Sequence, residues 1–140
     1  MPRKTTHPRR QRADRPVQPA SCPCDLQRTY ADCCGRFHRG EAAAPTAQGL
    51  MRSRYAAFVK RDEAYVLRTW HPRTRPPRVE FDPGTRWTGL EILDTSEGSA
   101  FHTTGTVTFR ASYTGGTLHE HSRFERVDGA WVYVDGEFIE

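Results

Sequence analysis

The sequence predicts an α+β fold in which helices precede an antiparallel sheet and a cysteine-containing knuckle precedes both. Apolar residues recur at helical spacing in 46–70, and short alternating runs separated by glycine-containing turns fill 86–138. Helices followed by a run of strands are typical of α+β folds, in which the helices cover one face of the sheet. The 140 residues suffice for one core. We divide them into a tail at 1–20, a knuckle at 21–40 and a folded domain at 41–140.

The tail at 1–20 is basic and rich in proline. It holds six basic residues against one acidic residue, whereas the rest of the chain holds 15 basic and 16 acidic residues. Four prolines prevent a helix, so we expect a disordered segment with solvated charges. Salt-dependent RNA binding through phosphate contacts is the alternative. We find neither a membrane-spanning apolar run nor a secretory signal, and we expect a cytoplasmic protein that does not associate with membranes.

Residues 46–70 predict two helices. Thr46 follows Pro45 and can cap the first helix, whose apolar face collects Ala47, Met51, Tyr55, Phe58 and Val59. Asp62 can cap a second, shorter helix. That helix must stop near His71, because Pro72 disfavours a helical conformation at the residue before it.

Four strands are expected after a proline-rich loop at 72–84. We place them at 87–94, 106–113, 118–127 and 130–138. The pairs Gly115–Gly116 and Asp128–Gly129 are typical of tight hairpin turns and separate the last three strands. The three tryptophans, Trp70, Trp87 and Trp131, are expected in the core because of their size.

The four cysteines stand close together as Cys22-Pro23-Cys24 and Cys33-Cys34, and the rest of the chain has none. Two short pairs joined by a connecting loop can place four thiolates tetrahedrally, about 2.3 Å from one zinc ion. Disulfides would require strained bridges, and redox cysteines usually occur as C-x-x-C, yet both remain alternatives. His38 could replace one cysteine as a ligand, but we expect it at the surface.

The knuckle, with Tyr30 between the cysteine pairs and Gly35 after them, resembles the SEC-C motif, the zinc-binding tail module of the SecA translocation ATPase. Over about residues 21–138 the chain is similar to the YchJ family of small bacterial proteins. That similarity rests on Met51–Phe58, Thr69–Pro72, Glu120–Phe124 and Asp128–Gly136. It implies a structural zinc ion and a cone-shaped domain similar to nuclear transport factor 2 (NTF2), with the helices packed into the concave face of a curved sheet. One departure is Asp25-Leu26-Gln27, which stands where the motif usually has Gly-Ser-Gly.

Cone folds of this type often enclose a pocket between helices and sheet. We name as polar pocket candidates Arg54, His71, Glu120, Ser122, Tyr133 and Asp135. Alternation places Glu120, Ser122 and Phe124 on one strand face, so Glu120 can point into the cone and act as a general base. The alternative is a structural ion pair between Glu120 and Arg54 or Arg123, and we expect this pair.

Two functions fit the sequence. The first is a binding or adaptor protein that docks through its knuckle; by resemblance to the SecA tail, its partner would be a ribosome, a chaperone or a nascent chain. The second is a small-molecule-binding protein or enzyme that uses the cone pocket, with zinc purely structural. No nucleophile with its base, phosphate loop or dinucleotide fingerprint supports a catalytic assignment. The sequence favours docking, because its only specific chemistry lies in the knuckle.

Overall fold

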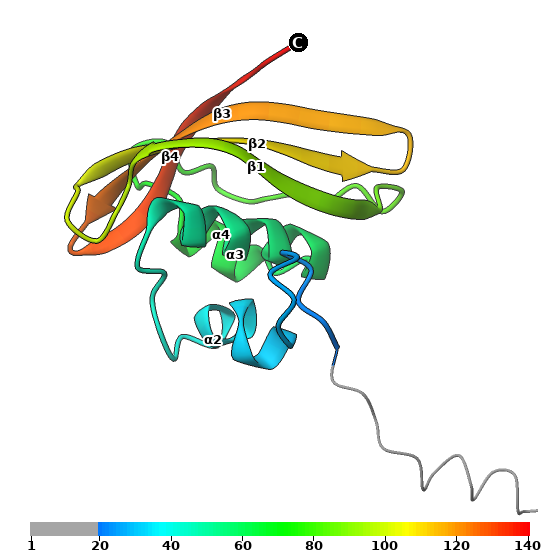
Figure 1. Ribbon diagram of the computed structural model, residues 1–140, viewed down its shortest axis with the longest axis horizontal. Helices are drawn as coiled ribbons and strands as arrows, with labels where there is room; N and C mark the ends of the chain where they lie inside the picture. The colour runs from blue at the N-terminus through cyan, green and yellow to red at the C-terminus, as the bar shows by residue number, and fades with distance from the viewer. Residues whose placement is uncertain (1–19) are drawn as a thin grey trace, which may run out of the picture.

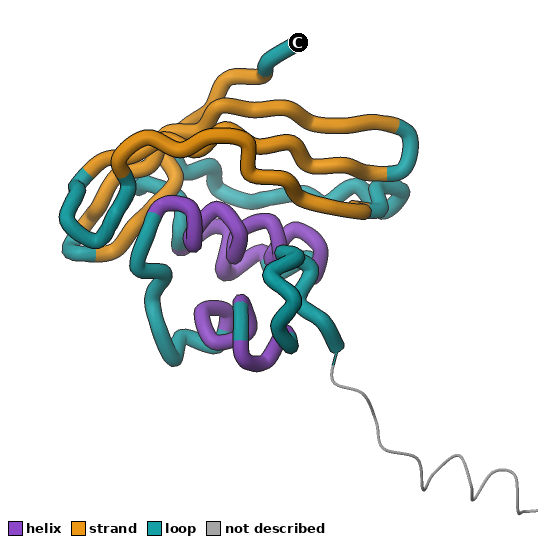
Figure 2. Tube along the Cα trace, in the orientation of Figure 1, coloured by secondary structure: helices purple, strands orange, loops and turns teal. Residues whose placement is uncertain are grey.

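The structure, a computed structural model, describes residues 20–140; the predicted tail therefore lies outside the described residues apart from Ala20. The described part stacks three layers, shown in Figures 1 and 2. A four-stranded sheet covers helices α3 and α4, and the cysteine knuckle with helix α2 lies on the far side of those helices. Helix α3 is therefore contacted from both sides. No helix among residues 20–140 has the length and apolar character needed to cross a bilayer.

The two predicted helices are present. Helix α3 spans Ala47–Lys60, and the Thr46 hydroxyl accepts a hydrogen bond from the Gly49 amide at 3.0 Å. Helix α4 spans Glu63–Arg68, and the Asp62 carboxylate accepts one from the Tyr65 amide at 3.1 Å. Each cap satisfies an amide that has no partner within the helix, which is why both helices begin at the predicted residues.

The sheet is antiparallel, in the order β1-β2-β3-β4. Its strands span Trp87–Glu97, Thr104–Tyr113, Gly116–Val127 and Ala130–Phe138. This confirms the predicted α+β fold, although β1 runs longer than expected and β2 and β3 begin earlier. Its inner face packs on α3 and α4 through a core that includes Val107, Phe109, Phe124 and Trp131. The segment that follows α4 lies beside β4, where Trp70 pairs with Tyr133.

The knuckle contains two short helices that the sequence did not predict. A 3-10 helix, η1, spans Tyr30–Asp32, and α2 spans Cys34–His38. Helices of three and five residues are too short to show an apolar period, and they depend on tertiary contacts for stability. His38 was expected at the surface; it is half-buried instead, because both of its ring nitrogens are used in contacts with other residues.

Candidate metal centre and ligand cavity

The four cysteine sulfurs form one compact cluster. Each Sγ lies within 4.8 Å of the other three, and the sulfurs of Cys24 and Cys33 are 3.5 Å apart. A tetrahedral zinc–thiolate site with bonds of about 2.3 Å has sulfurs about 3.8 Å apart, so these distances fit a tetrahedral site. All four side chains are at most 4% exposed. Cys22, Cys24, Cys33 and Cys34 therefore form a possible metal site whose donor set fits zinc.

Shared hydrogen bonds shift the thiol pKa values in opposite directions. Contacts from Cys24 and Cys34 lower the pKa of Cys22. Hydrogen bonding to Cys22 raises the pKa of Cys24 to about 12 and also raises the pKa of Cys34. A divalent cation that binds here must displace these protons, so metal binding is expected to weaken as the pH falls.

A tight backbone turn presents the first cysteine pair. The Cys22 amide donates to the Arg28 carbonyl at 2.8 Å, which closes a small loop. Within the loop, Asp25 and Gln27 have φ angles of 69° and 60°, in the left-handed region. The SEC-C motif usually has glycine at these two positions. The turn still forms with Asp25 and Gln27 in their place, at the cost of backbone strain in these two residues.

The knuckle is fixed to α3 through both packing and hydrogen bonds. Ala56 of α3, which is fully buried, belongs to the same buried cluster as the four cysteines. The Arg52 guanidinium donates to the Cys24 carbonyl at 2.7 Å. His38 Nε2 donates to the Ser53 carbonyl at 2.8 Å, and its Nδ1 accepts from the Tyr30 hydroxyl at 2.5 Å. The cysteine cluster thus packs on the outer side of α3.

On its other side α3 faces a cavity of about 150 Å³ beneath the sheet. Most of the wall is apolar and aromatic, made by Met51, Tyr55, Phe58, Trp70, Trp87 and Phe109. Four polar candidates also line it: Arg54 from α3, Glu120 and Ser122 from β3, and Tyr133 from β4. Apolar walls with a few convergent polar groups are typical of small-molecule sites.

Arg54 is the most unusual residue of this cavity. Its side chain is only 4% exposed, and among residues 20–140 it forms no ion pair. One terminal nitrogen, Nη1, donates to the Val66 carbonyl and the Thr69 hydroxyl at 2.8 and 2.7 Å. Burial lowers the pKa of Arg54 to about 10, so the guanidinium stays charged at neutral pH. Its carbon Cζ also lies 4.6 Å from the centre of the Tyr133 ring, at cation–π distance.

Glu120 lies on the sheet wall of the cavity and pairs with neither predicted arginine. Its Oε2 accepts hydrogen bonds from the Ser122 hydroxyl at 2.7 Å and the Tyr133 hydroxyl at 3.2 Å. A side chain at Gly136 would collide with this carboxylate, so the glycine makes room for it. The expected pair with Arg54 is absent because that guanidinium is held against α4, and Arg123 lies on the opposite face of β3 with Asp135.

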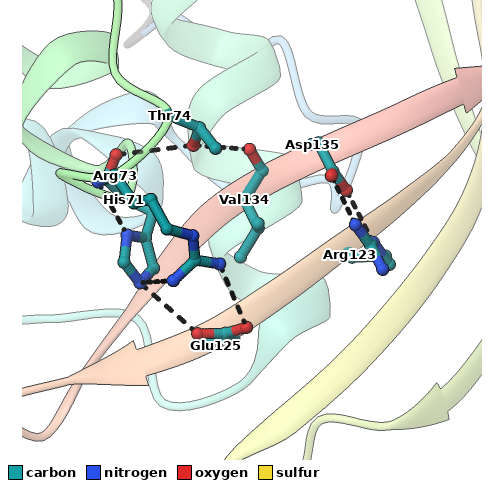
Figure 3. A network of polar contacts seen from close by, with 7 residues as sticks. All are labelled: His71, Arg73, Thr74, Arg123, Glu125, Val134 and Asp135. Atoms are coloured by element: carbon teal, nitrogen blue, oxygen red, sulfur yellow. Dashed lines mark hydrogen bonds and ion pairs between the residues drawn. The ribbon is translucent and has the colours of Figure 1, made fainter.

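The structure places the other two pocket candidates, His71 and Asp135, outside the cavity. Figure 3 shows His71 in contact with Arg73 and Glu125, and Asp135 in a separate pair with Arg123. His71 Nδ1 accepts from the Arg73 amide at 3.0 Å, and its Nε2 lies 3.4 Å from a Glu125 oxygen. Asp135 forms a bidentate ion pair with Arg123, which lowers the pKa of that carboxyl.

A β-bulge explains the position of Asp135. Arg123 pairs with Asp135 and Phe124 pairs with Tyr133, so Val134 is an extra residue in β4. The extra residue breaks the alternation of faces, and Asp135 turns outward while Tyr133 faces the cavity. Sequence alternation alone could not reveal this change.

Comparisons with known proteins agree with this architecture. The family model for the middle NTF2-like domain of YchJ matches residues 46–136. The UPF0225 protein SCO1677 of Streptomyces coelicolor is 75% identical over 119 residues, which cover 85% of this chain and 96% of that protein. The chain belongs to the YchJ (UPF0225) family.

Two solved structures of SEC-C motif proteins have the same fold as this YchJ-family chain. The solution structure of RPA3114 from Rhodopseudomonas palustris is 32% identical with a TM-score of 0.73, and the match covers 85% of this chain and 98% of that one. A crystal structure from Psychrobacter arcticus is 25% identical with a TM-score of 0.67, and that match covers 89% of this chain and 84% of the other. The knuckle and the helix-covered sheet are thus a shared arrangement.

The sequence of this YchJ-family chain did not reveal the aromatic walls of the cavity. Trp70 and Trp87 were expected in the core, but both are half-buried and line the cavity, as does Phe58. Their size and position fit a core equally well, since a cavity arises where neighbouring side chains fail to fill the space.

Proposed function

We propose that this YchJ-family chain binds a small molecule in the cavity between α3 and the sheet, and that a zinc ion held by the cysteine knuckle braces α3 from outside. The observation that carries the proposal is Arg54, a buried cation at the wall of an apolar cavity that forms no ion pair with any residue of 20–140. Burying a charge is costly unless it is paired, and such sites are commonly functional. A ligand that accepts hydrogen bonds from the guanidinium explains why a charged residue is buried here.

A cavity-filling substitution tests this proposal. Ala111 is 2% exposed and lines the cavity, so Ala111→Leu adds three carbon atoms inside it. Ala100→Leu, on an exposed loop, is the matched control. A thermal-shift screen of small ring compounds should yield ligands that raise the melting temperature of the wild type and of Ala100→Leu but not of Ala111→Leu. Equal responses in all three proteins would contradict the cavity as the site.

Docking through the knuckle is the second candidate function. Its supporting observation is the loop 25–28, in which four consecutive residues are exposed, including Leu26 at 45%. Leu26→Asp changes this loop without touching a cysteine. If the knuckle docks a ribosome, chaperone or nascent chain, affinity capture from lysate should lose that partner with Leu26→Asp while the zinc content stays unchanged. A partner retained by Leu26→Asp would place the contact elsewhere.

A further inference from the structure

The cavity has the size of one ring. A cavity of about 150 Å³ lined by apolar side chains holds a molecule such as benzene. Tyr55, Trp87 and Phe109 contribute aromatic walls, and aromatic faces favour planar partners in offset-stacked or edge-to-face contact. A planar molecule with a single ring therefore fits this space.

The two charged groups in the wall have hydrogen-bonding capacity to spare. Within the described residues, Nε and Nη2 of Arg54 donate to no partner, since both of its hydrogen bonds come from Nη1. Likewise, Oε1 of Glu120 accepts from none, since both of its hydrogen bonds reach Oε2. Arg54 can thus donate to an acceptor on the ligand, and Glu120 can accept from a donor.

Tyr133 contacts both of these groups. The Arg54 guanidinium lies over the Tyr133 ring, and the hydroxyl of the same tyrosine contacts Glu120. The guanidinium and the carboxylate therefore contact the same tyrosine, one at the face of its ring and the other at its hydroxyl. A ligand with one ring between its own acceptor and donor can contact both groups.

The charges of the wall also select the ligand. Among residues 20–140, the charged residues that line the cavity are one basic and one acidic, Arg54 and Glu120. An anionic ligand would be attracted by Arg54 but repelled by Glu120, and a cationic ligand would meet the reverse. A neutral ligand can form hydrogen bonds to both groups without introducing an unbalanced charge into an apolar site.

We infer that the ligand is a small neutral ring compound with a carbonyl acceptor at one end and an O–H or N–H donor at the other. This inference rests on the proposed function, since it names the chemical class that the same cavity selects. The carbonyl oxygen accepts from Arg54, the donor contacts Glu120, and the ring packs on the aromatic wall.

Three probes test the inference: 4-hydroxybenzamide, which is neutral with both groups; 4-hydroxybenzoate, which is anionic; and benzene, which has neither group. Saturation-transfer NMR at neutral pH should give 4-hydroxybenzamide a dissociation constant about tenfold or more below those of the other two, since each hydrogen bond to a charged group is worth roughly that factor. Glu120→Gln should reverse the preference towards 4-hydroxybenzoate, because it leaves the cavity with a net positive charge. Glu137→Gln, at an exposed position of β4, should not.

The wild-type comparison decides the inference even if Glu120→Gln fails to fold. Two results would overturn the assigned ligand class: tighter or equal binding of 4-hydroxybenzoate, or equal binding of benzene and 4-hydroxybenzamide. In either case the cavity would still be a binding site. Failure of all three probes to bind would count against the proposed function as well.

Discussion

Arg54 is a buried guanidinium whose direct hydrogen-bond partners are the uncharged Val66 and Thr69. Its pKa falls from 12.5 to about 10 because burial disfavours the charged form, a cost of roughly 3–4 kcal/mol at about 1.4 kcal/mol per pKa unit. Two hydrogen bonds from a charged donor contribute about 1.5–3 kcal/mol each, which is comparable. Stability alone therefore gives little reason for an arginine at this position, and ligand binding gives one.

Replacing Arg54 with methionine should leave the free energy of unfolding within about 1.5 kcal/mol of the wild type, because the loss of hydrogen bonds and the relief of a buried charge oppose each other. Urea denaturation measures this change. Binding of 4-hydroxybenzamide should be lost in the same variant. A destabilisation above about 3 kcal/mol, as expected when one partner of a buried ion pair is removed, would show that Arg54 is mainly structural.

Gln27 tests the backbone strain in the knuckle. A φ of 60° is strained for glutamine but not for glycine. Glycine, however, also gains entropy in the unfolded chain. The Gln27→Gly variant should therefore raise zinc affinity or leave it unchanged, measured by competition with a colorimetric chelator. Gln48→Gly, at the exposed second residue of α3, is the control and should leave zinc affinity unchanged while lowering stability by at most about 1 kcal/mol. Weaker zinc binding by Gln27→Gly would show that the glutamine side chain itself supports the turn.

At the scale of elements, α3 joins the two candidate sites. Ala56 and Arg52 contact the knuckle, while Met51, Arg54 and Tyr55 line the cavity. A helix presents residues three and four apart on the same face, so one short segment serves both sides. Changes at the metal site can therefore reach the cavity through the position of a single helix.

The Ala56→Leu substitution should loosen the contact between the knuckle and α3. The site is fully buried against the cysteines, and overpacking of such sites costs about 1–3 kcal/mol. Zinc affinity should fall together with stability, measured by chelator competition and denaturation. Ala64→Leu, on the exposed side of α4, should change neither. If Ala56→Leu binds zinc like the wild type, the knuckle does not depend on its contact with α3.

The elements differ in how far sequence could predict them. Helices α3 and α4 followed from local features, namely the caps at Thr46 and Asp62 and the proline after His71. The outward position of Asp135 depended on a bulge at Val134, and the fixed position of His38 depended on contacts with Tyr30 and Ser53. Bulges and tertiary hydrogen bonds leave no periodic trace in a sequence, so these features required the structure.

The whole molecule has two separable sources of stability. The apolar core between the sheet and the helices includes Leu50, Val66, Val107, Phe124 and Trp131. The knuckle has its own small cluster of cysteines, Ala56 and Tyr30. The larger core does not include the metal ligands, so the sheet should hold without metal, whereas the knuckle should not.

Metal removal tests that separation. A chelator should increase amide hydrogen exchange in residues 21–40 and leave the protection of β2 and β3 nearly unchanged. Lowering the pH should mimic the chelator, since protons compete with the metal for the thiolates. Loss of protection throughout the sheet would show that the knuckle is required for the fold as a whole.

The most direct test of the central claim, that the cavity is a ligand site, uses a methionine in the cavity wall. The chain has two methionines, Met1 and Met51, and Met51 lines the cavity. With 13C-methyl-methionine labelling, titration with benzene should shift the Met51 resonance saturably in the wild type and in Ala100→Leu, leave Met1 unmoved, and have no effect on Met51 in Ala111→Leu. A Met51 resonance that stays unmoved in the wild type, for benzene and for 4-hydroxybenzamide alike, would contradict the account.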